Sequence, residues 1–142
     1  MTTTRTYFDT CVYINAFRNN DTIGRRSFMA LTDGNRHGLC SLFLHLELLP
    51  KPSYYKRHDE VEFMQAALGS FELVESGDRQ LTDEAIRIAE SHGLSAMDAL
   101  HLAAAIRGGA AEFVTTEAQS KPLCRVHIDG LRVVSLQVVP QP

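Results

Sequence analysis

The sequence predicts an α/β domain in which helices cover both faces of a mainly parallel sheet. Short apolar segments alternate with helical patterns of about 10–15 residues, which is typical of parallel βαβ crossovers. The chain has 142 residues, 44% of them hydrophobic, enough to bury a core of its own. It shows no internal repeat, low-complexity tract or linker. We therefore expect residues 1–142 to form a single domain.

The predicted elements follow from the spacing of apolar residues and from the residues at their ends. Strands are predicted over residues 5–8, 38–43, 71–75, 112–116 and 131–139. Helices are predicted over residues 10–17, 59–68, 81–93 and 95–109. Two further helices are predicted, one that ends near Gly34 and one that carries Glu47 and is ended by Pro50 and Pro52. Thr82 and Ser95 are expected to cap the last two helices, which end at Gly93 and at Gly108 with Gly109.

The overall charge does not favour nucleic acid binding. With a net charge of -3 and a pI near 6.0, the field of the whole molecule does not attract a polyanion, so any such binding must be local. The best local candidate is residues 50–58, whose basic and aromatic side chains suit phosphates and a stacked base. These side chains are Lys51, Tyr54, Tyr55, Lys56, Arg57 and His58. The alternative is a solvated loop that leads into a helix.

The cysteines and the hydropathy pattern indicate a cytoplasmic protein. Cys11, Cys40 and Cys124 are odd in number and form no CxxC pair, which suits a reducing compartment. No window approaches the roughly 18 apolar residues of a membrane span, and no signal peptide is evident. We therefore expect a soluble, unprocessed protein without a membrane segment.

Four acids occupy positions where ligands bind in this architecture. Asp9 follows the first strand, Glu47 lies just past the second, and Glu117 follows the strand at 112–116. In parallel sheets, function collects at the carboxyl ends of the strands. Asp98 lies in the first turn of an Ala-rich helix, whose small residues let it approach the sheet closely. Carboxylate oxygens are the ligands of hard cations such as Mg²⁺, so the four acids predict a metal site.

Each acid also has a structural interpretation. Asp9 is a plausible turn residue or helix cap, and Asp98 lies three residues after Ser95, the spacing of a capping box. Glu117 is compatible with an ordinary surface acid. Glu47 is the most informative, because it interrupts the apolar run LFLHLELL, where an unpaired carboxylate is costly.

The motifs around these acids resemble those of PIN domains. YFDTCVYINAF is similar to the family's opening motif, SLFLHLELL to the second, in which Ser41 precedes Glu47 by six residues, LSAMDALHLAAA to the third and EFVTTE to the fourth. The third motif is the most specific. The resemblance extends over positions 7–117 in the family's order. In the fourth motif Glu117 replaces the usual Asp, and AQSKPL replaces an aromatic-containing tail, which leaves a direct contact of Glu117 with metal open.

The resemblance implies a three-layer α/β/α fold and metal-dependent hydrolysis of RNA. Asp9, Glu47 and Asp98, with Glu117, would be both the catalytic residues and the ligands of one or two Mg²⁺ or Mn²⁺ ions, while Thr10 and Thr115 would assist. Within the family, the sequence looks most like the VapC-type toxins of toxin–antitoxin pairs. That likeness implies a small antitoxin partner and a homodimer. The alternative is a non-catalytic PIN-fold module that binds RNA or protein.

Other constellations are incomplete. Cys11 stands where a haloacid-dehalogenase-like phosphatase needs a second Asp, the zinc deaminase PCxxC motif is missing, and neither GxGxxG nor a P-loop is present. His101 lies three residues after Asp98 and could orient a water or phosphate, although a histidine on an apolar helix is more often a core residue. Cys11 is expected to serve packing, because nothing nearby in sequence lowers its pKa.

Overall fold

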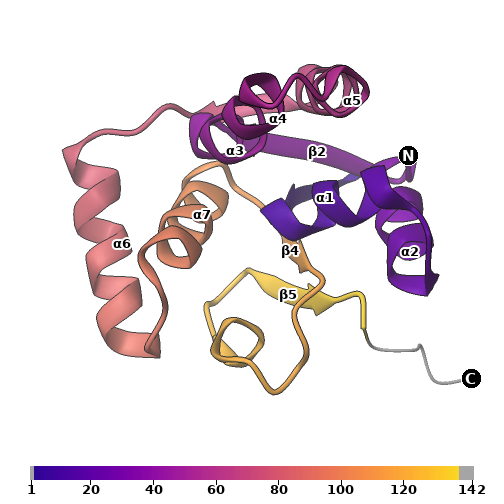
Figure 1. The fold of residues 1–142 in the computed structure, drawn as a ribbon. Coiled ribbons are helices and arrows are strands. Elements are labelled where there is room, and N and C mark those ends of the chain that lie inside the picture. The colour runs from indigo at the N-terminus through magenta and orange to yellow at the C-terminus, as the bar shows by residue number, and fades with distance from the viewer. Residues whose placement is uncertain (1, 138–142) are drawn as a thin grey trace, which may run out of the picture.

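The computed structural model describes residues 2–137, and its centre is a five-stranded, fully parallel β-sheet (Figure 1). The strand order is β3-β2-β1-β4-β5, so β1 lies in the middle. The strands are β1 (Thr4–Phe8), β2 (Arg36–Ser41), β3 (Glu72–Glu75), β4 (Glu112–Thr115) and β5 (Arg132–Ser135). The prediction of a strand over 131–139 is correct as far as β5; residues 138 and 139 lie outside the described residues.

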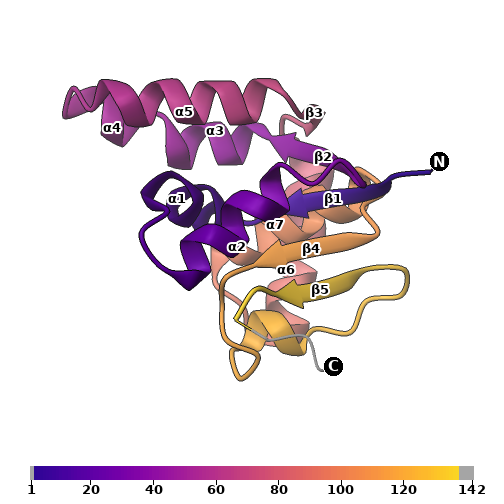
Figure 2. The same cartoon turned by 90° about the vertical axis from the view of Figure 1, so that its right-hand side faces the viewer.

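Helices cover both faces of this sheet. They are α1 (Thr10–Arg18), α2 (Thr22–Leu31), α3 (Leu42–Leu48), α4 (Pro50–Tyr54), α5 (His58–Gly69), α6 (Arg79–His92) and α7 (Ala96–Arg107), followed by the 3-10 helix η1 (Pro122–Arg125). Helices α6 and α7 lie on one side of the sheet, and α1, α2 and α5 lie on the other (Figures 1 and 2). The predicted three-layer α/β/α fold is confirmed.

The central strands are buried on both faces, which explains why their sequences are almost continuously apolar. Tyr7 and Phe8 of β1 point to opposite faces of the sheet, and each is at most 1% exposed. Tyr7 stacks on Phe113 and Phe8 stacks on Phe71, both with ring centroids 5.5 Å apart. Full burial of one such side chain contributes about 1.5–3 kcal/mol. This packed centre fixes the positions of the residues that follow β1 and β4, which include Asp9 and Glu117.

The start of α6 differs from the prediction, while its end is as predicted. The helix begins at Arg79 rather than near Thr82, because Asp78 is the N-cap and accepts a hydrogen bond from the Leu81 N–H at 2.8 Å. Asp78 also accepts a hydrogen bond at 2.9 Å from Arg107 of α7, a contact that local sequence does not reveal. Gly93 ends the helix in the left-handed conformation, with φ of 66°.

The segment 50–58 is mostly helical rather than a loop. Helix α3 ends at Leu48, and Pro50 then starts α4, because proline is tolerated in the first turn, where its missing N–H leaves no bond unmade. Pro52 therefore lies inside α4 and does not end α3, and α5 begins at His58. Among residues 2–137, no helix is both long enough and apolar enough to cross a membrane.

Candidate active site

A cleft of about 220 Å³ lies at the carboxyl end of the sheet and contains all four predicted acids. Its lining residues are Asp9, Thr10, Cys11, Ile14, Glu47, Met97, Asp98, His101 and Glu117. Asp9 and Glu117 lie just past the neighbouring strands β1 and β4, whereas Glu47 comes from α3 and Asp98 from the first turn of α7. None of the lining residues is Lys or Arg, so the cleft concentrates negative charge.

Asp9 is buried, with 6% exposure, and is held by hydrogen bonds on both carboxylate oxygens. Oδ1 accepts from the Thr10 N–H at 2.9 Å, and Oδ2 accepts from the Thr115 hydroxyl at 3.0 Å. Burial raises the pKa of Asp9 above its ordinary value, and the charge of Asp98 raises it further, against the lowering effects of His101 and Thr115. Asp9 caps α1 and at the same time faces the cleft, so its two sequence interpretations are compatible.

Glu47 takes part in a chain of polar contacts that reaches into the core. Its Oε1 accepts from the Thr10 hydroxyl at 2.7 Å and from His101 Nε2 at 2.5 Å. His101 Nδ1 lies 2.6 Å from the Tyr7 hydroxyl, which in turn lies 2.6 Å from the Ser41 hydroxyl. A carboxylate only accepts, so Nε2 donates to Glu47, and a neutral ring then accepts from Tyr7 at Nδ1.

The contacts of Glu47 favour its charged form. The hydrogen bond from His101 is the main cause that holds the pKa of Glu47 below its ordinary value, with Thr10 adding to it against partial burial. The side chain is still 30% exposed. The carboxylate is therefore anchored through Oε1 by buried His101 and half-buried Thr10. Glu47 itself lies in an exposed position of α3, so the expectation that the apolar run buries this acid is wrong.

The sequence predicted a core position for His101 but not its contact with Glu47. His101 is buried as expected for a core histidine, yet it also lines the cleft and binds Glu47. The available signal was its position one helical turn after Asp98, which puts both residues on the same face of α7. Nothing in the local pattern identifies Glu47 and Tyr7 as its partners, because they lie 54 and 94 positions away.

Asp98 and Glu117 are partly exposed at the cleft and are positioned mainly through their main chains. The Ser95 hydroxyl accepts from the Asp98 N–H at 3.3 Å, so the cap of α7 uses the backbone of Asp98. The Glu117 N–H donates to the Thr115 hydroxyl at 3.1 Å, and its carbonyl accepts from the Ser135 hydroxyl at 2.6 Å. Both backbones are fixed, while both carboxylates border the cleft.

Cys11 lines the cleft without the properties of a nucleophile. Burial, together with the neighbouring charge of Asp9, raises the pKa of its thiol to about 11. Its sulfur lies 3.5 Å from Asp9 Oδ2 and 3.3 Å from the Thr116 N–H. These contacts agree with the predicted packing role.

The donor set fits a hard cation. Among residues 2–137, no three His, Cys, Asp or Glu side chains are arranged so that they already form a metal-ligand set. Mg²⁺ does not require one, because it commonly uses one or two carboxylates and keeps several waters. The negative charge of Asp98 repels that of Asp9 and so raises the pKa of Asp9. A bound divalent cation would relieve this repulsion.

The chain is an all-parallel α/β/α domain with an acidic cleft at the carboxyl edge of its sheet, the edge at which such sheets bind their ligands. The sequence profile of the PIN domain matches residues 6–123, which is most of the chain. The chain therefore belongs to the PIN domain family, whose members are generally nucleases. A search of curated proteins found no match.

Solved structures share this fold at low sequence identity. A toxin–antitoxin complex from Klebsiella pneumoniae gives a TM-score of 0.70 at 21% identity, covering 92% of this chain and 97% of the other. VapBC2 from Rickettsia felis, bound to a DNA fragment from its promoter, gives 0.58 at 17% identity, covering 92% and 98%. A protein from Pyrobaculum aerophilum gives 0.52 at 22% identity, covering 94% and 92%.

Proposed function

We propose that the chain is a divalent-metal-dependent endoribonuclease that hydrolyses phosphodiester bonds in RNA. The observation that carries this proposal is the cleft in which a PIN fold gathers Asp9, Glu47, Asp98 and Glu117 without a balancing Lys or Arg. The substrate class follows from the family resemblance of the sequence motifs. Cytoplasmic action fits RNA as substrate and the three free cysteines.

The side chains of the cleft have distinct tasks in this proposal. Asp9, Glu47 and Asp98 would hold Mg²⁺ or Mn²⁺, and Glu117 borders the same space. The bound ion would supply neutralisation of the phosphate charge and a water of lowered pKa. Thr10 donates to Glu47 through its hydroxyl, and Thr115 donates to Asp9, so both threonines keep a carboxylate in place. His101 holds Glu47 from the buried side.

The test is cleavage of a labelled total-RNA pool with magnesium by the parent protein and by Asp9→Asn. We expect the parent to cut and the variant to lose nearly all activity, because the central carboxylate is neutralised. Asp83→Asn, at an exposed position of α6 away from the cleft, is the matched control and should cut like the parent. Binding of RNA by the parent without cleavage would instead support a non-catalytic module.

We also propose that the chain is the toxin of a type II toxin–antitoxin pair and forms a homodimer. The names of two structures with this fold support the pairing, since one is a toxin–antitoxin complex and the other is VapBC2. A cleft of carboxylates favours a partner that inserts a cation, most effectively an arginine with its bidentate fork. The homodimer rests on the family resemblance.

Co-purification from the native source tests the partner and the dimer together. A small protein that binds the chain and blocks its RNA cleavage is expected, and light scattering of the isolated chain should give twice its mass of 15.8 kDa. A monomer whose cleavage no neighbouring gene product inhibits would contradict both proposals.

A further inference from the structure

A second hollow, of about 240 Å³, lies directly beside the acidic cleft. It is lined by Ile14, Phe17, Arg18, Glu47, Leu48, Lys51, Pro52, Arg57 and Glu60, which come from α1, α3, α4, the start of α5 and the residue before it. We call it the basic groove. It shares Ile14 and Glu47 with the cleft, so the two hollows adjoin.

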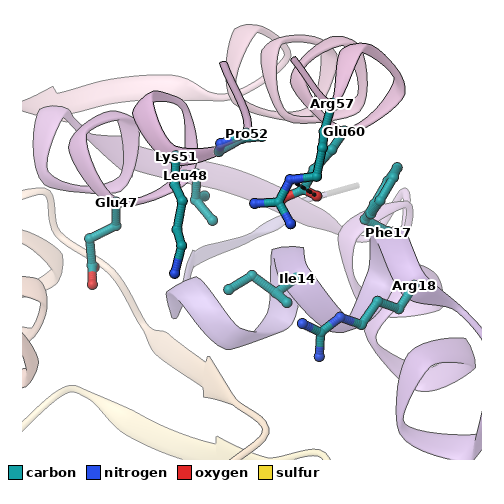
Figure 3. A pocket seen from close by; sticks show the side chains of 9 residues that line it. All are labelled: Ile14, Phe17, Arg18, Glu47, Leu48, Lys51, Pro52, Arg57 and Glu60. Atoms are coloured by element: carbon teal, nitrogen blue, oxygen red, sulfur yellow. Dashed lines mark ion pairs between the residues drawn. The ribbon is translucent and has the colours of Figure 1, made fainter. Parts of the chain in front are cut away.

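The groove has the opposite charge to the cleft. Figure 3 shows the cationic ends of Arg18, Lys51 and Arg57 directed into the space around Ile14, with Glu47 on the side of Lys51. Only Arg57 has an acidic partner here, Glu60, at the rather long distance of 3.6 Å. Within the described part of the chain, Arg18 and Lys51 form no ion pair.

Glu47 does not neutralise the groove. Its carboxylate is bound on the cleft side by His101 and Thr10, and these contacts account for its lowered pKa. Lys51 is exposed on the short helix that follows, one turn after Glu47 in sequence. The charge therefore changes sign at the boundary between cleft and groove. Carboxylates suited to a cation lie on one side, and Arg18 and Lys51, together with Arg57 in its long contact with Glu60, lie on the other.

The walls of the groove suit a nucleotide. Ile14 and Phe17, both half-buried, supply apolar surface beside the three cations, as a sugar or a base requires, while the lining residues Leu48 and Pro52 are almost fully buried. Arginine offers a planar fork to phosphate, and lysine a point charge. In a protein with a net charge of -3, three cations around one hollow are a local feature and not a consequence of composition.

We propose that the basic groove binds the phosphodiester backbone of a single RNA strand next to the phosphate that is cut in the cleft. This inference rests on the proposed ribonuclease function and adds the direction from which the strand enters, the side of α1, α4 and α5. It uses Lys51 and Arg57 of the basic-aromatic segment 50–58. Tyr54 and Tyr55 do not line the groove and are 79% and 61% exposed.

Binding is tested in an Asp9→Asn background, because this single variant should bind RNA without cutting it. The double variant Arg18→Gln, Lys51→Gln is made in that background and compared with Asp9→Asn alone. Fluorescence anisotropy with a labelled single-stranded RNA is measured over a range of salt concentrations. We expect Kd to rise about tenfold, in keeping with two lost charged contacts. The plot of log K against log salt should become shallower by about 0.7 for each lost phosphate contact.

The matched control is Arg79→Gln, Arg87→Gln in the same background. These two exposed arginines lie on α6, which contributes no residue to the groove, and their removal changes the net charge equally. Kd and the salt slope should stay near the parent values. Equal weakening by both double variants, or no weakening by either, would show that the groove is not a phosphate site.

Kinetics in the active background separate this inference from the function on which it rests. The groove variant should show a raised KM with kcat within about twofold of the parent, since no cleft residue changes. A parent that binds RNA through the groove but never cuts contradicts the nuclease proposal alone. A groove variant with unchanged KM that no longer binds its protein partner would overturn the inference and make the groove a partner site.

Discussion

At the scale of single residues, the main chain and the side chain of Asp98 have different roles. The cap of α7 uses the Ser95 hydroxyl and the main-chain N–H of Asp98, which any side chain leaves in place. The carboxylate itself faces the cleft and its charge raises the pKa of Asp9. The side chain is therefore available for a ligand role, and its removal costs the helix only its favourable interaction with the dipole.

The prediction for Asp98→Asn follows from this separation. A charge in the first turn of a helix contributes about 0.3–1 kcal/mol, whereas two carboxylates at 4 Å repel by up to ~4 kcal/mol at an effective dielectric of 20. Without metal, the variant should melt at the same temperature as the parent or higher. It should lose most of the stabilisation by magnesium and show almost no cleavage. Thermal melts with and without magnesium measure both, and equal stabilisation with retained cleavage would remove Asp98 from the site.

A second residue-scale prediction concerns His101 as a positioning residue. His101→Asn removes the ring that joins Glu47 to Tyr7, so Glu47 should lose its fixed orientation. Loss of such a supporting partner costs about 10–100-fold in metal affinity or activity. We expect kcat to fall by that factor, a higher magnesium concentration for half-maximal rate, and an unchanged KM for RNA.

The control for this prediction is His45→Asn, two residues before Glu47 on α3, because the Glu47 carboxylate takes its hydrogen bonds from Thr10 and His101 and not from His45. It should leave kcat and the magnesium requirement unchanged. A His101→Asn protein that loses stability but keeps the parent's magnesium requirement would show that His101 serves the core alone.

At the scale of secondary structure elements, acids at the two edges of the sheet have different partners. Glu112 starts β4 and is buried, with a side chain 3% exposed, but Arg36 of β2 lies 2.6 Å and Arg132 of β5 lies 3.0 Å from its oxygens. The Thr6 hydroxyl of β1 donates to it at 2.7 Å. This neutralised acid links four strands, whereas none of the four cleft acids forms an ion pair with Arg or Lys within the described part of the chain.

The pKa of Glu112 gives a prediction about pH and stability. Burial raises this pKa, but the hydrogen bonds from Arg36, Thr6 and Arg132 outweigh it and leave the pKa below the ordinary value. A lowered folded-state pKa stabilises the protein above the unfolded pKa, near pH 4.3, and this contribution is lost as pH falls through the folded pKa. The parent should therefore lose stability more steeply below pH 4.3 than Glu112→Gln.

At neutral pH, Glu112→Gln should reduce the free energy of unfolding by about 1–3 kcal/mol, because a charged hydrogen-bond acceptor is lost. Urea titrations at several pH values measure both effects. Glu62→Gln, at an exposed position of α5, is the control and should show neither. If the free energies of unfolding of the parent and of Glu112→Gln changed with pH in parallel, the lowered pKa of Glu112 would not contribute to stability, and the prediction would be contradicted.

At the scale of the whole molecule, a small negative net charge conceals two sites of opposite sign. The net charge of -3 does not attract RNA over a distance, yet the acidic cleft and the basic groove share Glu47 and Ile14 at their boundary. A cation in the cleft would remove the local repulsion of phosphate. Metal binding and RNA binding are thus expected to support each other.

Removal of metal should abolish activity without unfolding the protein. The sheet is held together by its strand pairing and by its apolar core, so excess EDTA should stop RNA cleavage and leave the far-UV circular dichroism unchanged. Magnesium or manganese should restore cleavage and raise the melting temperature by several degrees, since a ligand at one hundred times its Kd adds about 2.7 kcal/mol. Cleavage that persists in excess EDTA would contradict a metal mechanism.

The sequence by itself determined the α/β class, the parallel strands and the positions of the four acids after strands or in a helix turn. These features depend on neighbours within a few residues: alternating apolar runs, the glycine that ends α6 at Gly93, and the serine that starts α7 at Ser95. Local patterns therefore sufficed. They also named the cleft acids, because Asp9 and Glu117 follow β1 and β4, Glu47 lies in the helix after β2, and Asp98 lies in the first turn of α7.

Only the tertiary structure decided which of these groups meet. The partners of Glu47 and His101, the contact of Asp78 with Arg107 that accompanies the earlier start of α6, and the groove beside the cleft all join residues that are distant in the chain. Local patterns carry no signal for such pairs, because the pairs form only when crossovers bring α1, α3 and α7 to one edge of the sheet. The acids were predictable because their positions depend on neighbouring residues. Their partners were not, because those lie far away in the chain and come close only in the folded protein.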